Sequence, residues 1–480
     1  MKAKHFILPT LLTALLCASC AANGSNSNIT DSVTDTTNTV ETEDALTDNL
    51  PEADFGGAVY NILTQTQSDA DFLAESETGS AINDAVFRRN TAVSERFHVT
   101  ITVDSRASWA DGGDHCGTAL RNSVNAGDDS YQLYSDCILS AAPNGMQNML
   151  LNLADLEYID LSQPWWNQSC REALSIEDNV YVMTGSIVPT FTSFMHCLFM
   201  NKRLGTNLDL TSTVYDTVFA GDWTIDYFHS LLKDTWQDLN GDGKRDENDS
   251  YGYYAQATTW AEIYTYAFGE KTTSRDSDGM PIIKFNMDKY ASMVETVYSL
   301  LFETEGTYPN EDYGFGMFTD GRALFTTGVF DHAFDSFSNM TDDFAILPYP
   351  KWDTAQAGYY TFSDGAAPAV GIPTTVTDTK MASIVTEALA AEGHRSVLPV
   401  VYENAIKTRG TRDEESMKII DIIANGNIID FGFIFETGGQ TMQYLVRAKD
   451  SNFASYYEKN IKSWEKKLNS IIESYLEAQQ

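Results

Sequence analysis

The first apolar periodicity lies between residues 55 and 183, where short strand-like runs alternate with helical stripes. One helix is predicted from Ile82, Val86, Val93 and Phe97, whose spacing of four and seven places them on one face. Strands are predicted at 58–63, 98–103, 131–139 and 180–183. Helices that alternate with strands at this spacing are typical of a layered α/β domain.

The second half of the chain continues the same alternation. Strands are predicted at 344–347 and 367–372. Helices are predicted at 224–236, after Asn286, and at 381–391, 414–423 and 453–476. The apolar stripe of the last helix is expected to dock on its own domain, with a partner helix as the alternative. A chain of 480 residues predicts about two to three domains.

A run of acidic residues and glycines at 238–249 has the spacing of a calcium loop. Gly243 occupies position six, where such a loop turns sharply, and the last position is Asp where Glu is usual. Oxygen ligands are expected at Asp238, Asn240, Asp242, the Lys244 carbonyl, Asp246 and Asp249. We therefore predict a structural Ca²⁺ site. The alternative is an acidic turn that binds no metal.

The first 20 residues have the pattern of a lipoprotein signal peptide. Lys2 and Lys4 precede an apolar run at 6–16, and small residues lead to Cys20, which we expect to carry the lipid. The apolar run is too short to span a bilayer as a helix. Residues 21–50 are mostly Ser, Thr, Asn, Asp and Glu, which predicts a disordered acidic tether at the outer face of the cell membrane.

The composition limits the classes of partner. The formal net charge is −37, and such a surface repels nucleic acid and anionic lipid, which argues against both as partners. An exported protein permits disulfides. The sequence leaves open either buried free thiols or one or two disulfides among Cys116, Cys137, Cys170 and Cys197.

Several short motifs occur along the chain in a fixed order. They are Leu153-Ala-Asp-Leu156, Pro164-Trp-Trp-Asn167, Phe199-Met-Asn-Lys202, Tyr251-Gly-Tyr253, Asp320-Gly-Arg-Ala-Leu-Phe325 and Leu347-Pro-Tyr-Pro350. Their order, behind a lipoprotein-like leader, resembles that of the extracellular solute-binding proteins that feed ABC importers, in the maltose-binding-like family 1 group. The resemblance covers roughly residues 55–426.

The resemblance implies an α/β, periplasmic-binding-protein-like fold of type II, a clamshell of two lobes joined by crossing hinge segments. The N-terminal lobe is then expected to comprise 51–187 with part of 326–374. The C-terminal lobe would comprise 188–325 with 375–480. The implied function is to capture a carbohydrate, an oligosaccharide, outside the cell and deliver it to the transmembrane subunits of an ABC permease. The implied mechanism is hinge closure by a monomer, without covalent chemistry.

The resemblance also indicates which side chains contact the ligand. An aromatic ring stacks on the apolar face of a sugar, and carboxylates accept its hydroxyl protons. The expected contacts are Tyr134, Asp136, Trp260, Phe330, Asp331, Tyr360 and Asp364. Trp165 and Trp166 are expected to be packing residues, and Trp109 is a further candidate for the cleft lining.

Three other functions stay open at this point. A glycan-active hydrolase needs two carboxylates at a set separation, which a sequence does not report, although no HExxH, G-x-S-x-G or P-loop motif is present. A polyamine or other cationic solute would suit Asp136, Asp331 and Asp364 beside aromatic rings. A glycan-capture protein without an importer is the third. We expect a binding protein and no enzyme.

Overall fold

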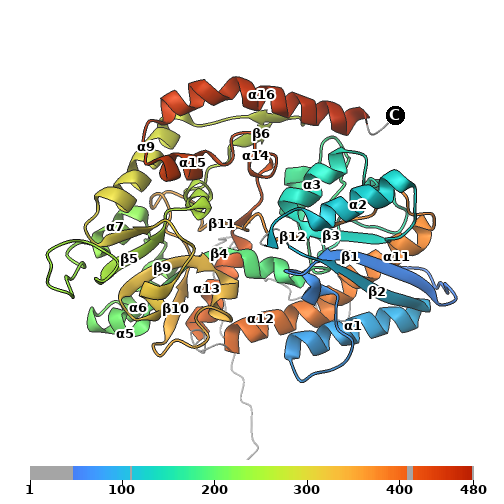
Figure 1. The fold of residues 1–480 in the computed structure, drawn as a ribbon, viewed down its shortest axis with the longest axis horizontal. Helices are drawn as coiled ribbons and strands as arrows, with labels where there is room; N and C mark the ends of the chain where they lie inside the picture. Colours follow the sequence, from blue (N-terminus) through green and yellow to red (C-terminus); the bar gives the residue numbers. More distant parts are fainter. Residues whose placement is uncertain (1–46, 109–110, 408–413, 478–480) are drawn as a thin grey trace, which may run out of the picture. The chain divides into compact units, whose positions relative to one another are not determined.

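Two β-sheets, each built from distant parts of the chain, organise the computed structural model, which describes residues 47–108, 111–407 and 414–477 (Figure 1). Residues Thr47–Gln480 form one unit by their contacts. The signal peptide with Cys20, the tether up to residue 46, and Trp109 lie outside the described residues. Within the described part, no helix is long and apolar enough to cross a membrane.

The first sheet has the strand order β12-β3-β1-β2. Its strands are β1 (Ala58–Gln65), β2 (Val99–Arg106), β3 (Leu133–Cys137) and β12 (Pro368–Gly371). β1 pairs in parallel with β2 and β3, whereas β12 runs antiparallel to β3. Every residue of β3 and β12 is buried, as expected for strands covered on both faces.

Helices cover both faces of the first sheet. They are α1 (Ala81–Phe97), α2 (His115–Ala126), α3 (Ile138–Met146) and α11 (Thr379–Glu392). Figure 1 shows α2 and α3 on one side of the strands and α1 on the other. The predicted lobe boundaries placed α11 in the C-terminal lobe. In the structure it packs on α1, and its Thr386 hydroxyl lies 2.7 Å from the Tyr60 hydroxyl of β1.

The second sheet has the strand order β10-β4-β9-β5-β8. Its strands are β4 (His196–Asn201), β5 (Tyr251–Gln256), β8 (Thr307–Asn310), β9 (Ala323–Val329) and β10 (Phe344–Leu347). β5 is parallel to β8 and β9, whereas β4 is antiparallel to β9 and β10. The carboxyl ends of β5, β8 and β9 therefore lie at one edge of the sheet.

Shorter elements complete the described part of the chain. The helices are α4 (Gln168–Leu174), α5 (Lys202–Asn207), α6 (Thr211–Ala220), α7 (Ile225–Leu231), α8 (Ile263–Ala267), α9 (Met287–Tyr298), α10 (Gly316–Thr319), α12 (Leu398–Lys407), α13 (Glu414–Asn425), α14 (Phe431–Ile434), α15 (Thr441–Ala448) and α16 (Phe453–Glu477). Two small sheets pair β6 (Thr273–Arg275) with β7 (Pro281–Ile283), and β11 (Thr361–Phe362) with β13 (Asn427–Ile428).

Two passages of the chain between the sheets lie side by side. The 3₁₀ turn η5 (Pro189–Phe194) leads into β4, and the segment after β11 returns to the first sheet. The Asp364 N–H donates to the Phe194 carbonyl at 2.8 Å, and the Thr361 hydroxyl donates to the His196 carbonyl at 2.7 Å. These bonds join the passages that any hinge motion would bend.

The elements predicted from apolar periodicity are largely confirmed, with two corrections. The predicted helix at 224–236 is shorter, because Asp234 has φ +58°, which a right-handed helix does not allow. The predicted strand at 180–183 makes one bridge only, between Met183 and Val370 on the side of β12 opposite β3, because the Val180 carbonyl at its start accepts from the Leu153 N–H outside the sheet.

Burial settles two alternatives that the sequence left open. Cys116, Cys137, Cys170 and Cys197 are all buried free thiols. Trp165 and Trp166 are each 2% exposed, which confirms them as packing residues. Their indole N–H groups donate to the two carboxylate oxygens of Glu387 on α11, at 2.8 and 2.9 Å.

Candidate functional site

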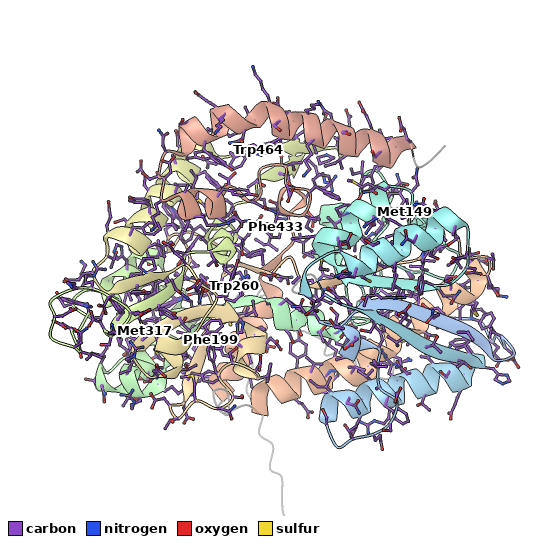
Figure 2. All side chains as sticks on the ribbon, viewed as in Figure 1. Met149, Phe199, Trp260, Met317, Phe433 and Trp464 are labelled. Atoms are coloured by element: carbon purple, nitrogen blue, oxygen red, sulfur yellow. The ribbon has the colours of Figure 1, made fainter. Side chains whose placement is uncertain are left out.

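Trp260 lies just beyond the carboxyl end of β5, on the 3₁₀ turn η6 (Thr259–Glu262). The Thr258 hydroxyl caps this turn by accepting from the Trp260 N–H at 3.4 Å. The indole is half-buried, and four rings surround it at centroid distances of 5.3–6.0 Å: His196, Tyr313, Phe315 and His332. Figure 2 shows Trp260 near the middle of the view, between the strands of the two sheets.

The neighbouring strand β9 brings a second turn to the same edge. This turn, η8 (Phe330–Ala333), carries a buried Phe330 and an exposed Asp331. His332 Nδ1 accepts from the Val329 N–H at 2.9 Å, so the neutral ring carries its proton on Nε2. Burial, followed by the nearby His196, lowers the pKa of His332 to about 4. His332 is therefore neutral at physiological pH.

Asp364 completes the cluster from the returning passage. Its Oδ2 lies 3.7 Å from Nε2 of His196, which is fully buried and stacks on Phe362 at 4.8 Å with an interplanar angle of 8°. Burial favours a raised pKa for Asp364. The His196 contact and the Ala366 N–H outweigh it, and the pKa is lowered. The side chain is 28% exposed, so a charged carboxylate stands beside the Trp260 ring. We call Trp260, His196, His332 and Asp364 the Trp260 cluster.

The predicted ligand contacts fall in three places. Trp260 and Asp364 lie in the Trp260 cluster, and Phe330 and Asp331 directly precede His332 on η8. The remaining three contacts lie elsewhere. Tyr360 lines a separate groove of about 800 Å³, described below.

Tyr134 and Asp136 lie inside the first sheet and contact each other. The Tyr134 hydroxyl donates to Asp136 Oδ2 at 2.8 Å and accepts from Asn144 at 3.0 Å, while Asp136 Oδ1 accepts from the Cys137 N–H. Burial raises the pKa of Asp136. Both residues are at most 1% exposed. The structure does not bring them to the Trp260 cluster, and their contact with a ligand stays a prediction.

The two histidines of the cluster were not predicted as site residues. His332 directly follows Phe330 and Asp331, which were predicted, so its position was a usable signal. His196 opens an apolar strand and has no local pattern of its own. The pairing of β4 with β9, and of β9 with β5, brings it to Trp260.

The loop at 238–249 turns as a calcium loop would, with φ +72° at Gly243. Its carboxylate oxygens accept from N–H groups of the loop and of Trp236, which lies just before it. Asp238 accepts from Gly241 and Gly243 at 2.6 and 2.8 Å, and the buried Asp249 accepts from the Trp236 indole at 2.9 Å. In the described ranges, no group of three or more His, Cys, Asp or Glu side chains is arranged to hold a metal ion. Calcium binding therefore stays a prediction.

At the level of sequence, no protein-family model and no curated protein matches the chain. Solved structures do match. The galacto-N-biose/lacto-N-biose I-binding protein of an ABC transporter from Bifidobacterium longum, in complex with lacto-N-biose, superposes with a TM-score of 0.54 at 12% identity. The match covers 89% of this chain and 98% of that one.

Two further structures match over similar lengths. An ABC substrate-binding protein from Listeria monocytogenes, in complex with cycloalternan, has a TM-score of 0.52 at 12% identity, with coverage of 87% and 99%. The maltose/maltodextrin-binding domain from Bdellovibrio bacteriovorus, bound to maltotriose, has a TM-score of 0.51 at 12% identity, with coverage of 88% and 99%. The chain therefore has the fold of the solute-binding proteins of ABC transporters, as the order of its motifs predicted.

Proposed function

We propose that this protein captures a carbohydrate, an oligosaccharide, outside the cell and delivers it unchanged to an ABC permease. The observation that carries the proposal is the half-buried Trp260 ring with the charged Asp364 beside it. Sugar recognition uses this combination, an aromatic face for C–H groups and a carboxylate for hydroxyl protons. The three similar structures, each holding an oligosaccharide, support the same ligand class.

The position of Asp364 supports a hinge mechanism. Asp364 belongs to the passage that returns to the first sheet, and its N–H is bonded to Phe194 of the other passage. A ligand hydroxyl bound by Asp364 would therefore act directly on the pair of segments that bend. Ligand that binds better to a closed form shifts the population toward it.

The anchoring of the protein belongs to the same proposal. A lipid on Cys20 would hold the chain at the outer face of the cell membrane, and the acidic tether would let the folded part reach the permease. The protein would work there as a monomer. Labelling with a fatty-acid analogue, compared with the Cys20→Ala variant, tests the anchor: loss of label in the variant supports it, and equal label overturns it.

The decisive experiment measures binding by calorimetry against a panel of neutral oligosaccharides. Trp260→Ala should weaken binding of the best ligand about tenfold, or about 1.4 kcal/mol, because it removes the apolar face on which the sugar stacks. The matched control is Trp352→Ala, a partly buried tryptophan that packs on Phe268 away from the cluster. Equal affinity of the Trp260 variant and the parent protein would overturn the assignment.

A cationic solute is the second candidate, because the lowered pKa of Asp364 keeps a negative charge beside an aromatic ring. The panel should therefore include spermidine at two salt concentrations. Binding of spermidine that falls steeply with salt would favour this candidate, since screening weakens exposed charge pairs. Cleavage of a glycan into shorter products during incubation with the protein would instead identify a hydrolase.

A further inference from the structure

A groove of about 800 Å³ opens beside the small sheet of β11 and β13, away from the Trp260 cluster. Tyr360 lies directly before β11, and Asn427 begins β13 and pairs with Thr361. Phe285 lies after β7 and is half-buried. Ser169, on α4, also lines the groove. The groove therefore joins segments that are far apart in the sequence, around the two small sheets β6–β7 and β11–β13.

Two polar groups in the lining of this groove are buried and unsatisfied. Asn427 is 9% exposed, and its Oδ1 accepts from the Ser363 hydroxyl at 3.3 Å. Its Nδ2 has no hydrogen-bond partner among the described residues, nor does the Ser274 hydroxyl. Buried polar groups are normally paired, so each of these two groups needs a further hydrogen-bond partner. A ligand hydroxyl that reached these atoms would supply such a partner.

The groove carries positive charge in a strongly acidic protein. Lys271 and Lys284 are exposed in its lining, and neither is in an ion pair with a described carboxylate. Glu270, the acidic residue of the lining, is already paired with Lys289 at 2.8 Å. Asp430 lies behind the groove, where donors including the hydroxyls of Thr272 and Thr273 satisfy its oxygens. Among the charged groups of the lining, those outside any ion pair with a described residue are therefore the two lysines.

We infer that this groove is a second ligand site, and that its ligand is a sugar carrying a carboxylate, a uronic acid. The Tyr360 and Phe285 rings offer apolar faces to the C–H groups of the sugar. Asn427 Nδ2 donates to a ring hydroxyl, and the ammonium groups of Lys271 and Lys284 bind the carboxylate through charge-assisted hydrogen bonds. The inference goes beyond the proposed function, because it holds whichever solute the Trp260 cluster binds.

The site also touches the returning passage of the chain. Tyr360 and Thr361 stand on the same short stretch as Asp364, so a ligand in the groove holds one end of the segment whose other end contacts the Trp260 cluster. Occupancy of the groove is thereby expected to change the affinity of the cluster for its own ligand, and the reverse by the same factor.

Calorimetric titration of the full chain with D-glucuronate, D-glucose and acetate tests the inference. Glucuronate should bind, and D-glucose and acetate should each bind about tenfold more weakly, since each lacks one part of the recognised group. Lys271→Gln and Lys284→Gln should each weaken glucuronate binding about twofold to fivefold, the range of an exposed charge pair. Both lysines are exposed, so the variants should fold.

Two control variants distinguish binding in the groove from a general effect of charge and from binding at the Trp260 cluster. Lys462→Gln removes an exposed charge on α16 outside the groove and should leave glucuronate binding unchanged. Trp260→Ala should also leave it unchanged while weakening the oligosaccharide. Equal binding of glucuronate and glucose, or an equal loss in Lys462→Gln, would overturn the inference. Loss of glucuronate binding in Trp260→Ala alone would assign the acidic sugar to the Trp260 cluster and remove the second site.

Discussion

Glu387 is a buried carboxylate that receives two indole N–H groups and no cation. It is 1% exposed and lies on α11, where its two oxygens bind Trp165 and Trp166. Burial raises its pKa from 4.5 to about 7, against the opposing effect of the two indole hydrogen bonds. Since each tenfold change in proton affinity corresponds to about 1.4 kcal/mol, ionisation of Glu387 costs the folded state about 3 kcal/mol.

The sign of the pH dependence follows from the raised pKa. Below pH 4.5 Glu387 is protonated in both the folded and the unfolded state. Between pH 4.5 and 7 only the unfolded state releases the proton, so the contribution of Glu387 to stability is lost as the pH rises through its folded pKa. Glu387→Gln removes this titration. The substitution also leaves one indole N–H facing the amide N–H of the new glutamine. This lowers the stability of the folded variant by about 1–3 kcal/mol at every pH.

The measurement is urea unfolding of the parent protein and of Glu387→Gln at several pH values, followed by circular dichroism. The parent should be the more stable at pH 4.5, and its advantage over the variant should shrink by about 3 kcal/mol by pH 8. The other titratable groups are the same in both proteins, so their effect on stability cancels when the two free energies of unfolding are subtracted. The control is Glu473→Gln, an exposed glutamate on α16, whose difference from the parent should not change with pH. A constant difference for Glu387→Gln as well would refute the raised pKa.

Three further predictions concern other parts of the fold. Calcium at a hundredfold excess over its Kd should stabilise the folded state by about 2.7 kcal/mol through the loop at 238–249; a melting temperature unmoved by chelation would contradict this. Tyr475→Phe removes the hydroxyl that donates to the Leu174 carbonyl of α4 at 3.1 Å, and should cost about 1 kcal/mol in urea unfolding. Asp71→Asn leaves one acceptor for the two groups of Thr190 that Asp71 now binds, so amide hydrogen exchange in η5 should accelerate; unchanged exchange would show that Asp71 does not hold this passage.

The spacing of apolar residues along the chain was sufficient to predict most of the helices and strands. The stripe from Ile82 to Phe97 became α1, the stripe beginning at Phe453 became α16, and the apolar run at 344–347 became β10. This works because a helix or strand must present its apolar residues on one face, and the spacing of that face is a local property of the sequence. The order of the motifs then led to the fold that the solved structures confirm.

Contacts between distant segments had no such local signature. Tyr360 and Asp364 are close in sequence, yet one lines the groove and the other lies in the Trp260 cluster. His196 meets Asp364 because two passages between the sheets are hydrogen-bonded to each other, and it meets Trp260 because β4 pairs with β9 and β9 with β5. Strand order and register decide which side chains converge, and they result from the packing of the whole chain, so the composition of the sites became visible only in the tertiary structure.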